Sequence, residues 1–128
     1  MGHITSTLEA ESDLTVITVV GKVDAEQIAS QIISFLTGEP TQLVLWDIRE
    51  GSLVSLSSND LQMIVKRGAQ FADRRKGGRT AIVCSKDLDY GLSRMFQAFA
   101  SLQHIPFEID VFRNLEEARE WLNEHRKG

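Results

Sequence analysis

Cysteine, proline and tyrosine are scarce in this chain, with one Cys, two Pro and one Tyr among 128 residues. The single cysteine, Cys84, excludes an internal disulfide and a metal site built from several thiolates. No apolar run approaches the ~20 residues that a membrane-spanning helix needs. The net charge of -4 gives no excess of positive charge for binding nucleic acid or an anionic membrane. We therefore expect a cytoplasmic protein with no stable membrane insertion and no nucleic-acid partner.

A repeated pattern predicts the fold. Four times along the chain, an apolar segment typical of a strand is followed by a polar capping residue and an amphipathic helix. These units are residues 14–20 with 24–36, 43–48 with 57–72, 81–84 with 87–102, and 107–112 with 114–122. A further strand, residues 5–10, precedes the first unit across a short polar turn. The pattern predicts one α/β domain over residues 1–128, a mixed five-stranded sheet with an antiparallel first pair, mostly parallel strands thereafter, and four helices.

Polar residues mark where the predicted helices begin. Asp24 with Gln27, and Ser57 with Asp60, have the spacing of capping boxes, and Asp87 is the expected N-cap of the third helix. We expect the basic run at residues 74–79 to be a solvated helix end. The apolar side chains predicted to form the buried face of the third helix are Leu88, Leu92, Met95, Phe96, Phe99 and Leu102.

Polar side chains gather where two predicted parallel strands end, which is where ligands bind in open α/β sheets. The candidates for such a ligand rim are Asp47, Arg49 and Ser55 after one strand, and Ser85, Tyr90 and Arg94 after its neighbour. Arginines and hydroxyls would suit an anionic or polar ligand. The alternative is a structural ion pair of Asp47 with Arg49 or Arg94, which the lack of a glycine-rich phosphate loop favours.

Catalytic and metal-binding patterns are missing from the sequence. Cys84 ends an apolar strand and is predicted to be a small buried hydrophobe. The histidines His3, His104 and His125 show no metal-ligand spacing with another His, Cys or carboxylate. No nucleophile stands beside a base, so we expect a non-enzyme without metal or cofactor.

Three stretches connect the chain to a known group of proteins: residues 43–49 (LVLWDIR), 90–96 (YGLSRMF) and 111–122 (VFRNLEEAREWL). With the order of elements, they resemble the STAS/SpoIIAA-like superfamily, which shares its architecture with small SEC14-type lipid-binding domains. The last stretch is similar to the closing strand and helix of bacterial members that are mostly uncharacterised. The resemblance covers essentially the whole chain.

The resemblance also points to two serines. Anti-anti-sigma members carry a phosphorylatable serine, usually within Asp-Ser-Ser-Gly-Leu, at the start of the helix after the central strand. Ser57 and Ser58 stand at that place, but Leu56 and Asn59 replace the acid and the glycine. The resemblance thus implies phosphorylation or partner contact at these serines, while a plain N-cap role for Ser57 is the alternative.

The function that follows is a regulatory or protein-interaction module without catalysis, acting on a protein partner or by self-association. The alternative is a small-molecule or lipid carrier of SEC14-like architecture, holding a small apolar or anionic ligand. That alternative depends on whether Met95, Phe96 and Phe99 present more apolar surface than the sheet can cover, which would leave a pocket.

Overall fold

The computed structural model describes residues 2–127. Its five strands are β1 (His3–Glu9), β2 (Leu14–Lys22), β3 (Leu43–Ser52), β4 (Arg79–Val83) and β5 (Glu108–Phe112). Its helices are α1 (Ala25–Thr37), α2 (Ser58–Ala69), α3 (Asp87–Leu102) and α4 (Leu115–Lys127), with short 3-10 turns η1 (Ala10–Ser12) and η2 (Ala72–Arg75). The sheet order is β1-β2-β3-β4-β5, with β1 antiparallel to β2 and all later pairs parallel. The predicted mixed sheet is confirmed.

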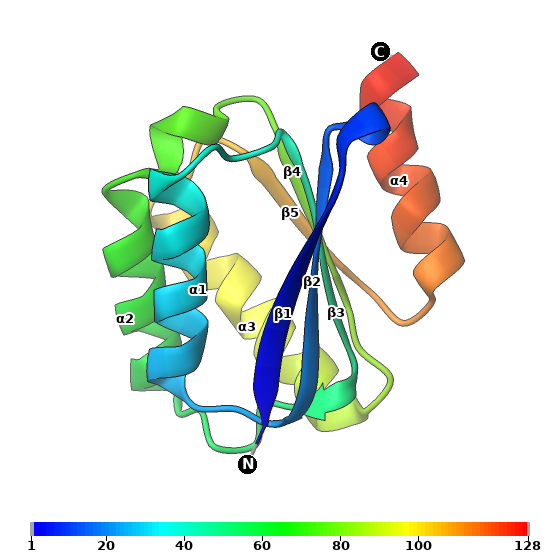
Figure 1. Ribbon diagram of the computed structural model, residues 1–128. Coiled ribbons are helices and arrows are strands. Elements are labelled where there is room, and N and C mark those ends of the chain that lie inside the picture. The colour runs from blue at the N-terminus through cyan, green and yellow to red at the C-terminus, as the bar shows by residue number, and fades with distance from the viewer. Residues whose placement is uncertain (1, 128) are drawn as a thin grey trace.

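The helices form two unequal layers (Figure 1). Strand order follows chain order, so the three crossovers β2-α1-β3, β3-α2-β4 and β4-α3-β5 all run in one direction across the sheet. Because such crossovers are right-handed, α1, α2 and α3 fall on the same face. The closing helix α4 lies alone on the opposite face, against β3, β4 and β5.

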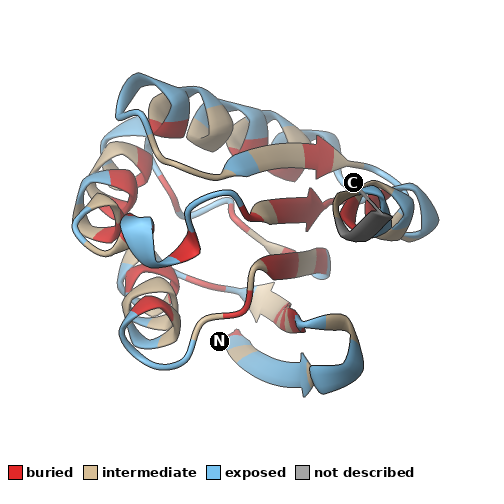
Figure 2. Ribbon diagram, turned by 90° about the horizontal axis from the view of Figure 1, so that it is seen from above, coloured by how far each residue is buried: buried red, intermediate tan, exposed pale blue. Residues whose placement is uncertain are grey.

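The strand residues alternate between two apolar clusters. On β3, Ile48 packs in the cluster beneath α1–α3, whereas Leu43 and Leu45 pack with Ala118 and Leu122 of α4. Figure 2 shows burial concentrated in the central strands, while β1, which begins beside the N-terminus, is largely exposed. The central strands therefore carry the core, and β1 is a peripheral strand.

Both predicted capping boxes are confirmed. The Asp24 carboxylate accepts the Gln27 N–H at 2.9 Å, and the Gln27 side chain accepts the Asp24 N–H at 3.0 Å. Ser57 and Asp60 make the same reciprocal pair at the start of α2. The prediction that Asp87 caps α3 is wrong: Lys86 is the N-cap, it makes no capping side-chain bond, and Asp87 is the first helical residue.

The strands β2 and β3 run further than predicted. β3 continues to Ser52 because its end pairs with the end of β2, beyond a register shift between Thr18 and Val20. A Cβ added at Gly51 would lie 2.7 Å from Val19 Cγ1, so this close approach requires glycine. The extension brings the end of β3 into the candidate site.

The predicted buried face of α3 is rotated. Leu88, Met95 and Leu102 are exposed, by 53%, 39% and 73%. The buried α3 residues are Asp89, Ser93 and Ala100. Leu92, Phe96 and Phe99 are partly buried against the core, as predicted. Asp89 accepts a hydrogen bond from the Leu53 amide, which places this carboxylate on the inner face of α3 and leaves Leu88 and Leu102 exposed.

The basic run at residues 74–79 is not a solvated helix end throughout, because Arg75 is only 2% exposed. Its donors reach Thr41 O at 2.9 Å, Gln42 O at 2.8 Å, Arg79 O at 2.9 Å and Thr80 Oγ1 at 2.7 Å. The guanidinium also stacks 4.3 Å from the centre of the Phe107 ring. Burial lowers the pKa of Arg75 to about 10. This side chain joins the segments that lead into β3 and β4.

Candidate functional site

The loop between β3 and α2 has buried anchors and an exposed tip. Leu53 and Leu56 are each 6% exposed, and the Leu56 N–H donates to Leu53 O at 3.0 Å, which closes a tight turn. Between them, Val54 and Ser55 point to solvent. Ser57 and Ser58, at the start of α2, are exposed as well. We call Val54, Ser55, Ser57 and Ser58 the loop surface.

Side chains at and just before the start of α3 form hydrogen bonds with this loop and with the end of β3. Asp89 Oδ1 accepts the Leu53 N–H at 2.8 Å. Lys86 Nζ donates to Gly51 O at 2.6 Å, and Ser85 Oγ donates to Arg49 O at 2.9 Å. These bonds form because β3 and β4 are parallel neighbours, so the segments that follow them lie together at the carboxyl end of the sheet. The loop surface is therefore presented on a fixed backbone.

The anchoring carboxylate is deeply buried. Asp89 is 1% exposed, and within residues 2–127 its Oδ2 has no hydrogen-bond partner. Lys86 Nζ lies 3.5 Å from that oxygen and partly neutralises it. Asp89 is not among the site residues that the sequence predicts. The signal was weak: an acid in a first helical turn, followed four residues later by the small Ser93.

Cys84 is buried next to this anchor, in surroundings that disfavour a thiolate. Its Sγ lies 3.3 Å from Ser93 Oγ, and burial raises the pKa of the thiol. The side chain is fully buried, as the sequence predicts for a small hydrophobe. Its surroundings favour the neutral thiol rather than a reactive thiolate.

The two serines differ in what their hydroxyls do. Ser57 Oγ accepts the Asp60 N–H at 3.1 Å, so this hydroxyl is used as the helix cap. Among the side chains described, residues 2–125, none forms a hydrogen bond with the Ser58 hydroxyl, and Ser58 is the first residue of α2. A phosphate on Ser57 would disrupt the cap beside the Asp60 carboxylate. A phosphate on Ser58 would lie at the positive end of the helix dipole without breaking that bond.

The predicted ligand rim is divided by the sheet. Asp47 and Arg49 follow Leu43 and Leu45 on the α4 side, where Arg49 Nε and Nη2 each bond the Asp47 carboxylate at 2.9 Å. Ser85 joins them only through the backbone carbonyl of Arg49. The geometry is that of the structural ion pair, with the Asp47 carboxylate engaged by a neighbour rather than open to a ligand.

The other rim candidates lie apart from this pair. Tyr90 lies beneath the Arg113 guanidinium, 4.4 Å from the ring centre, and Arg113 also pairs with Asp87 at 2.7 Å. Arg94 is exposed on α3, across the sheet from Asp47. Ser55 belongs to the loop surface. The six predicted positions thus form no common site.

The ion pair gives a testable pH effect. Hydrogen bonds from Arg49 lower the pKa of Asp47. The pair therefore stabilises the fold at neutral pH, and this contribution is lost as the pH falls through that lowered pKa. In Arg49→Gln we expect the pKa of Asp47 to rise to its ordinary range, measured by NMR titration of the carboxyl carbon. An unchanged titration would show that Arg49 does not hold this carboxylate.

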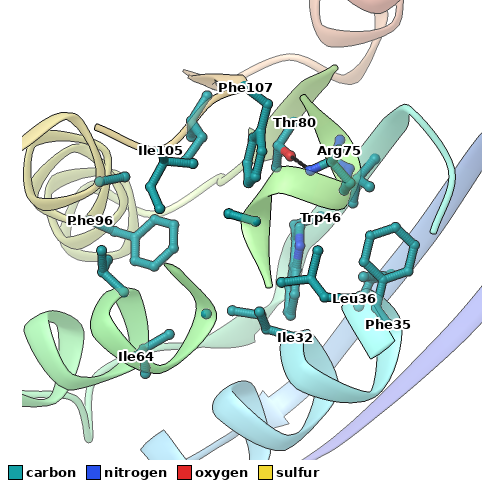
Figure 3. Close-up of a pocket in the computed structure, with 17 residues that line it drawn as sticks. Ile32, Phe35, Leu36, Trp46, Ile64, Arg75, Thr80, Phe96, Ile105 and Phe107 are labelled. Atoms are coloured by element: carbon teal, nitrogen blue, oxygen red, sulfur yellow. Dashed lines mark hydrogen bonds between the residues drawn. The ribbon is translucent and has the colours of Figure 1, made fainter. Parts of the chain in front are cut away.

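Two small apolar cavities lie between the sheet and the α1–α3 layer, with volumes of about 70 and 60 Å³. Both are lined by Ile32, Trp46, Ile64, Thr80 and Phe96. Figure 3 shows the first, with Phe96 and Ile64 pointing into it and Arg75 near one end beside Thr80. An engineered apolar cavity of ~150 Å³ accepts benzene, and each of these two has about half that volume or less. The carrier alternative stays a prediction.

Within residues 2–127, no cluster of three or more His, Cys, Asp or Glu is placed to hold a metal ion. No helix formed by these residues has the length and apolar character needed to cross a membrane.

Comparison with known families decides the relationship. The model of the family described as SpoIIAA-like matches residues 14–123, which is most of the chain and includes the whole candidate site. The chain belongs to the SpoIIAA-like family. No match is found among curated proteins.

Solved structures of SpoIIAA-like proteins share the fold. An uncharacterised DUF3478 protein from Shewanella loihica is 26% identical, with 95% of each chain covered and a TM-score of 0.53. An anti-sigma factor antagonist from Mycobacterium paratuberculosis is 16% identical, with 94% of each chain covered and a TM-score of 0.57. Unphosphorylated SpoIIAA, also an anti-sigma factor antagonist, is 17% identical, with 94% of this chain and 97% of that chain covered and a TM-score of 0.50.

Proposed function

We propose that this SpoIIAA-like protein is a non-enzymatic regulatory module that docks a partner protein through the loop surface. The observation that carries the proposal is that the exposed loop surface lies on a backbone fixed by hydrogen bonds. Val54, 55% exposed, stands among three exposed serines, while Leu53 is held by the Asp89 carboxylate. A rigid surface loses little conformational entropy on binding, which favours protein recognition.

The relatives support a protein partner. Two of the solved structures with this fold are named anti-sigma factor antagonists, a name that describes action on another protein. The chemistry of the chain agrees with docking rather than catalysis. Ser57 is used as a cap and Cys84 is a buried neutral thiol, so neither is an activated nucleophile.

We further propose Ser58 as the position at which docking is regulated. Its hydroxyl is exposed and leaves the capping box intact, so a modification there adds charge without unfolding the helix start. A phosphate would bring about two negative charges to the loop surface. The unmodified loop surface carries no charge. After phosphorylation, a partner that binds it would have to remove water from a dianion.

Substitution at Ser58 tests the proposal. We expect Ser58→Glu to lose a protein that the unmodified chain captures from its host's extract, identified by mass spectrometry. The matched control is Ser30→Glu, which adds the same charge at an exposed position in the middle of α1. Equal melting temperatures of the two variants would exclude unfolding as the cause.

Two outcomes would contradict the proposal. If Ser58→Glu and Ser30→Glu retained the captured protein equally, the loop surface would not be the docking site. If no protein were captured by the unmodified chain but a small molecule left it on denaturation in native mass spectrometry, the carrier alternative would replace the interaction module.

A further inference from the structure

The two edges of the sheet differ in how their backbone groups are used. At the β5 edge, Glu108 and Phe112 bond toward β4, so Ile109 and Val111 face outward. Each has one backbone group engaged by a side chain: Gln97 Nε2 donates to Ile109 O at 2.6 Å, and Asp110 Oδ1 accepts the Val111 N–H at 2.9 Å. Each engaged group is unavailable to an incoming strand, so this edge is less open to pairing.

The β1 edge has no such protection. β1 is a seven-residue outer strand (Figure 1), and no side chain of residues 2–125 makes a hydrogen bond to its backbone. Its sequence, HITSTLE, contains none of the lysines or prolines that commonly protect edge strands. Leu8 is 62% exposed on it. A regular strand of this length with open backbone groups is a template for pairing.

The sequence of β1 identifies the partner strand. Read from either end about Ser6, it is self-complementary: His3 matches Glu9, Ile4 matches Leu8, and Thr5 matches Thr7. We propose that β1 pairs antiparallel with β1 of a second copy of this chain, with Ser6 at the two-fold axis. The two five-stranded sheets then join into one continuous sheet.

The faces of the strand agree with this register. Residues that oppose each other are both odd or both even, so each pair lies on one face of the joined sheet. Ile4 packs on the α1 side of the sheet. Leu8 is four residues further along the same strand, so its side chain lies on that side too. In the proposed register the second copy's Ile4 would stand opposite Leu8 and cover it. Glu9 lies on the α4 side, where it pairs with Arg119 at 3.0 Å, and the second copy's His3 would complete that cluster.

Disulfide trapping tests the register. Cα atoms directly opposite in antiparallel strands are ~4.5–5.5 Å apart, within the ~4.4–6.8 Å range of disulfides. Ser6→Cys should therefore form an intermolecular disulfide under mild oxidation, seen on a non-reducing gel. Thr7→Cys is the matched control, because two such cysteines would be diagonal neighbours ~7–8 Å apart. The natural Cys84 is buried and does not interfere. Equal cross-linking of both variants would overturn the register.

Sedimentation velocity tests the dimer itself. We expect the unmodified chain to show a mass near twice 14.4 kDa and Leu8→Lys to lose the dimer. Leu102→Lys, an equally drastic change at an exposed leucine that ends α3, should remain dimeric. A monomeric unmodified chain, or a dimer that survives Leu8→Lys, would overturn the proposal. Ser58→Glu should leave the mass unchanged, so this result stands apart from that of the partner experiment.

Discussion

Arg75→Ala is expected to lower the free energy of unfolding by ~3–5 kcal/mol, because it removes four hydrogen bonds, two of them to the buried Thr41 O and Thr80 Oγ1. The guanidinium bonds three backbone carbonyls and the Thr80 hydroxyl, and it fills space beside Phe107. Loss of a buried cation offsets part of this cost, since burial already lowers the pKa of Arg75 to about 10. Urea denaturation followed by circular dichroism measures the difference.

The adjacent arginine provides the control. Arg74 is exposed and makes one bond, from Nη1 to Leu36 O at 2.9 Å. Arg74→Ala should therefore cost less than ~1 kcal/mol. Arg75→Lys should fall between the two, because an ammonium keeps the charge but cannot replace the planar fork. If Arg75→Ala and Arg74→Ala were equally stable, the bonds of the buried guanidinium would contribute nothing net to the fold.

The second large effect is expected at Asp89. Asp89→Ala removes the acceptor of the Leu53 amide and should lower stability by ~1.5–3 kcal/mol, the range for hydrogen bonds to charged groups. The change should be greatest at the loop surface. Hydrogen exchange of the Leu53 amide is expected to accelerate by ~10–100-fold, since each ~1.4 kcal/mol corresponds to a factor of ten. NMR-detected exchange reports that amide separately from the rest of the chain.

Two variants separate anchoring from charge. Asp89→Asn keeps an acceptor for Leu53 and should protect that amide better than Asp89→Ala. Asp87→Ala removes a carboxylate two residues away that pairs only at the surface, with Arg113, and should leave the Leu53 amide unchanged. If Asp89→Ala left exchange at Leu53 unaffected, the loop surface would be held by Leu53 and Leu56 packing alone.

Most of the fold could be predicted because its signals are local. Strand and helix periods give the order of elements, and the Asp24 and Ser57 capping boxes depend on residues three apart. The rotation of α3 could not be predicted in this way. Apolar spacing places Leu88 and Leu102 inward, but the helix is oriented by Asp89, whose partner Leu53 is 36 residues away. A contact between distant segments overrides local periodicity here.

The candidate site could be predicted only in outline. The resemblance selects both serines, whereas the atomic contacts assign the cap to Ser57 and leave Ser58 exposed. The predicted ligand rim depends on the assumption that residues following adjacent strands converge. Strand alternation instead places Asp47 and Arg49 on the α4 side, away from Tyr90 and Arg94. A run of charged residues does not indicate which member is buried, so the sequence alone predicts that Arg75 is solvated like its neighbours.

The partly occupied β5 edge has a consequence for how far the proposed assembly can proceed. A sheet with two open edges can add copies at both ends and grow into a fibre. Here Gln97 and Asp110 each occupy one backbone group of β5, so pairing through β1 would use the more open edge of each molecule. The proposed association would then favour two copies over a longer polymer. Substituting Gln97 and Asp110 would free the β5 groups and should favour filaments.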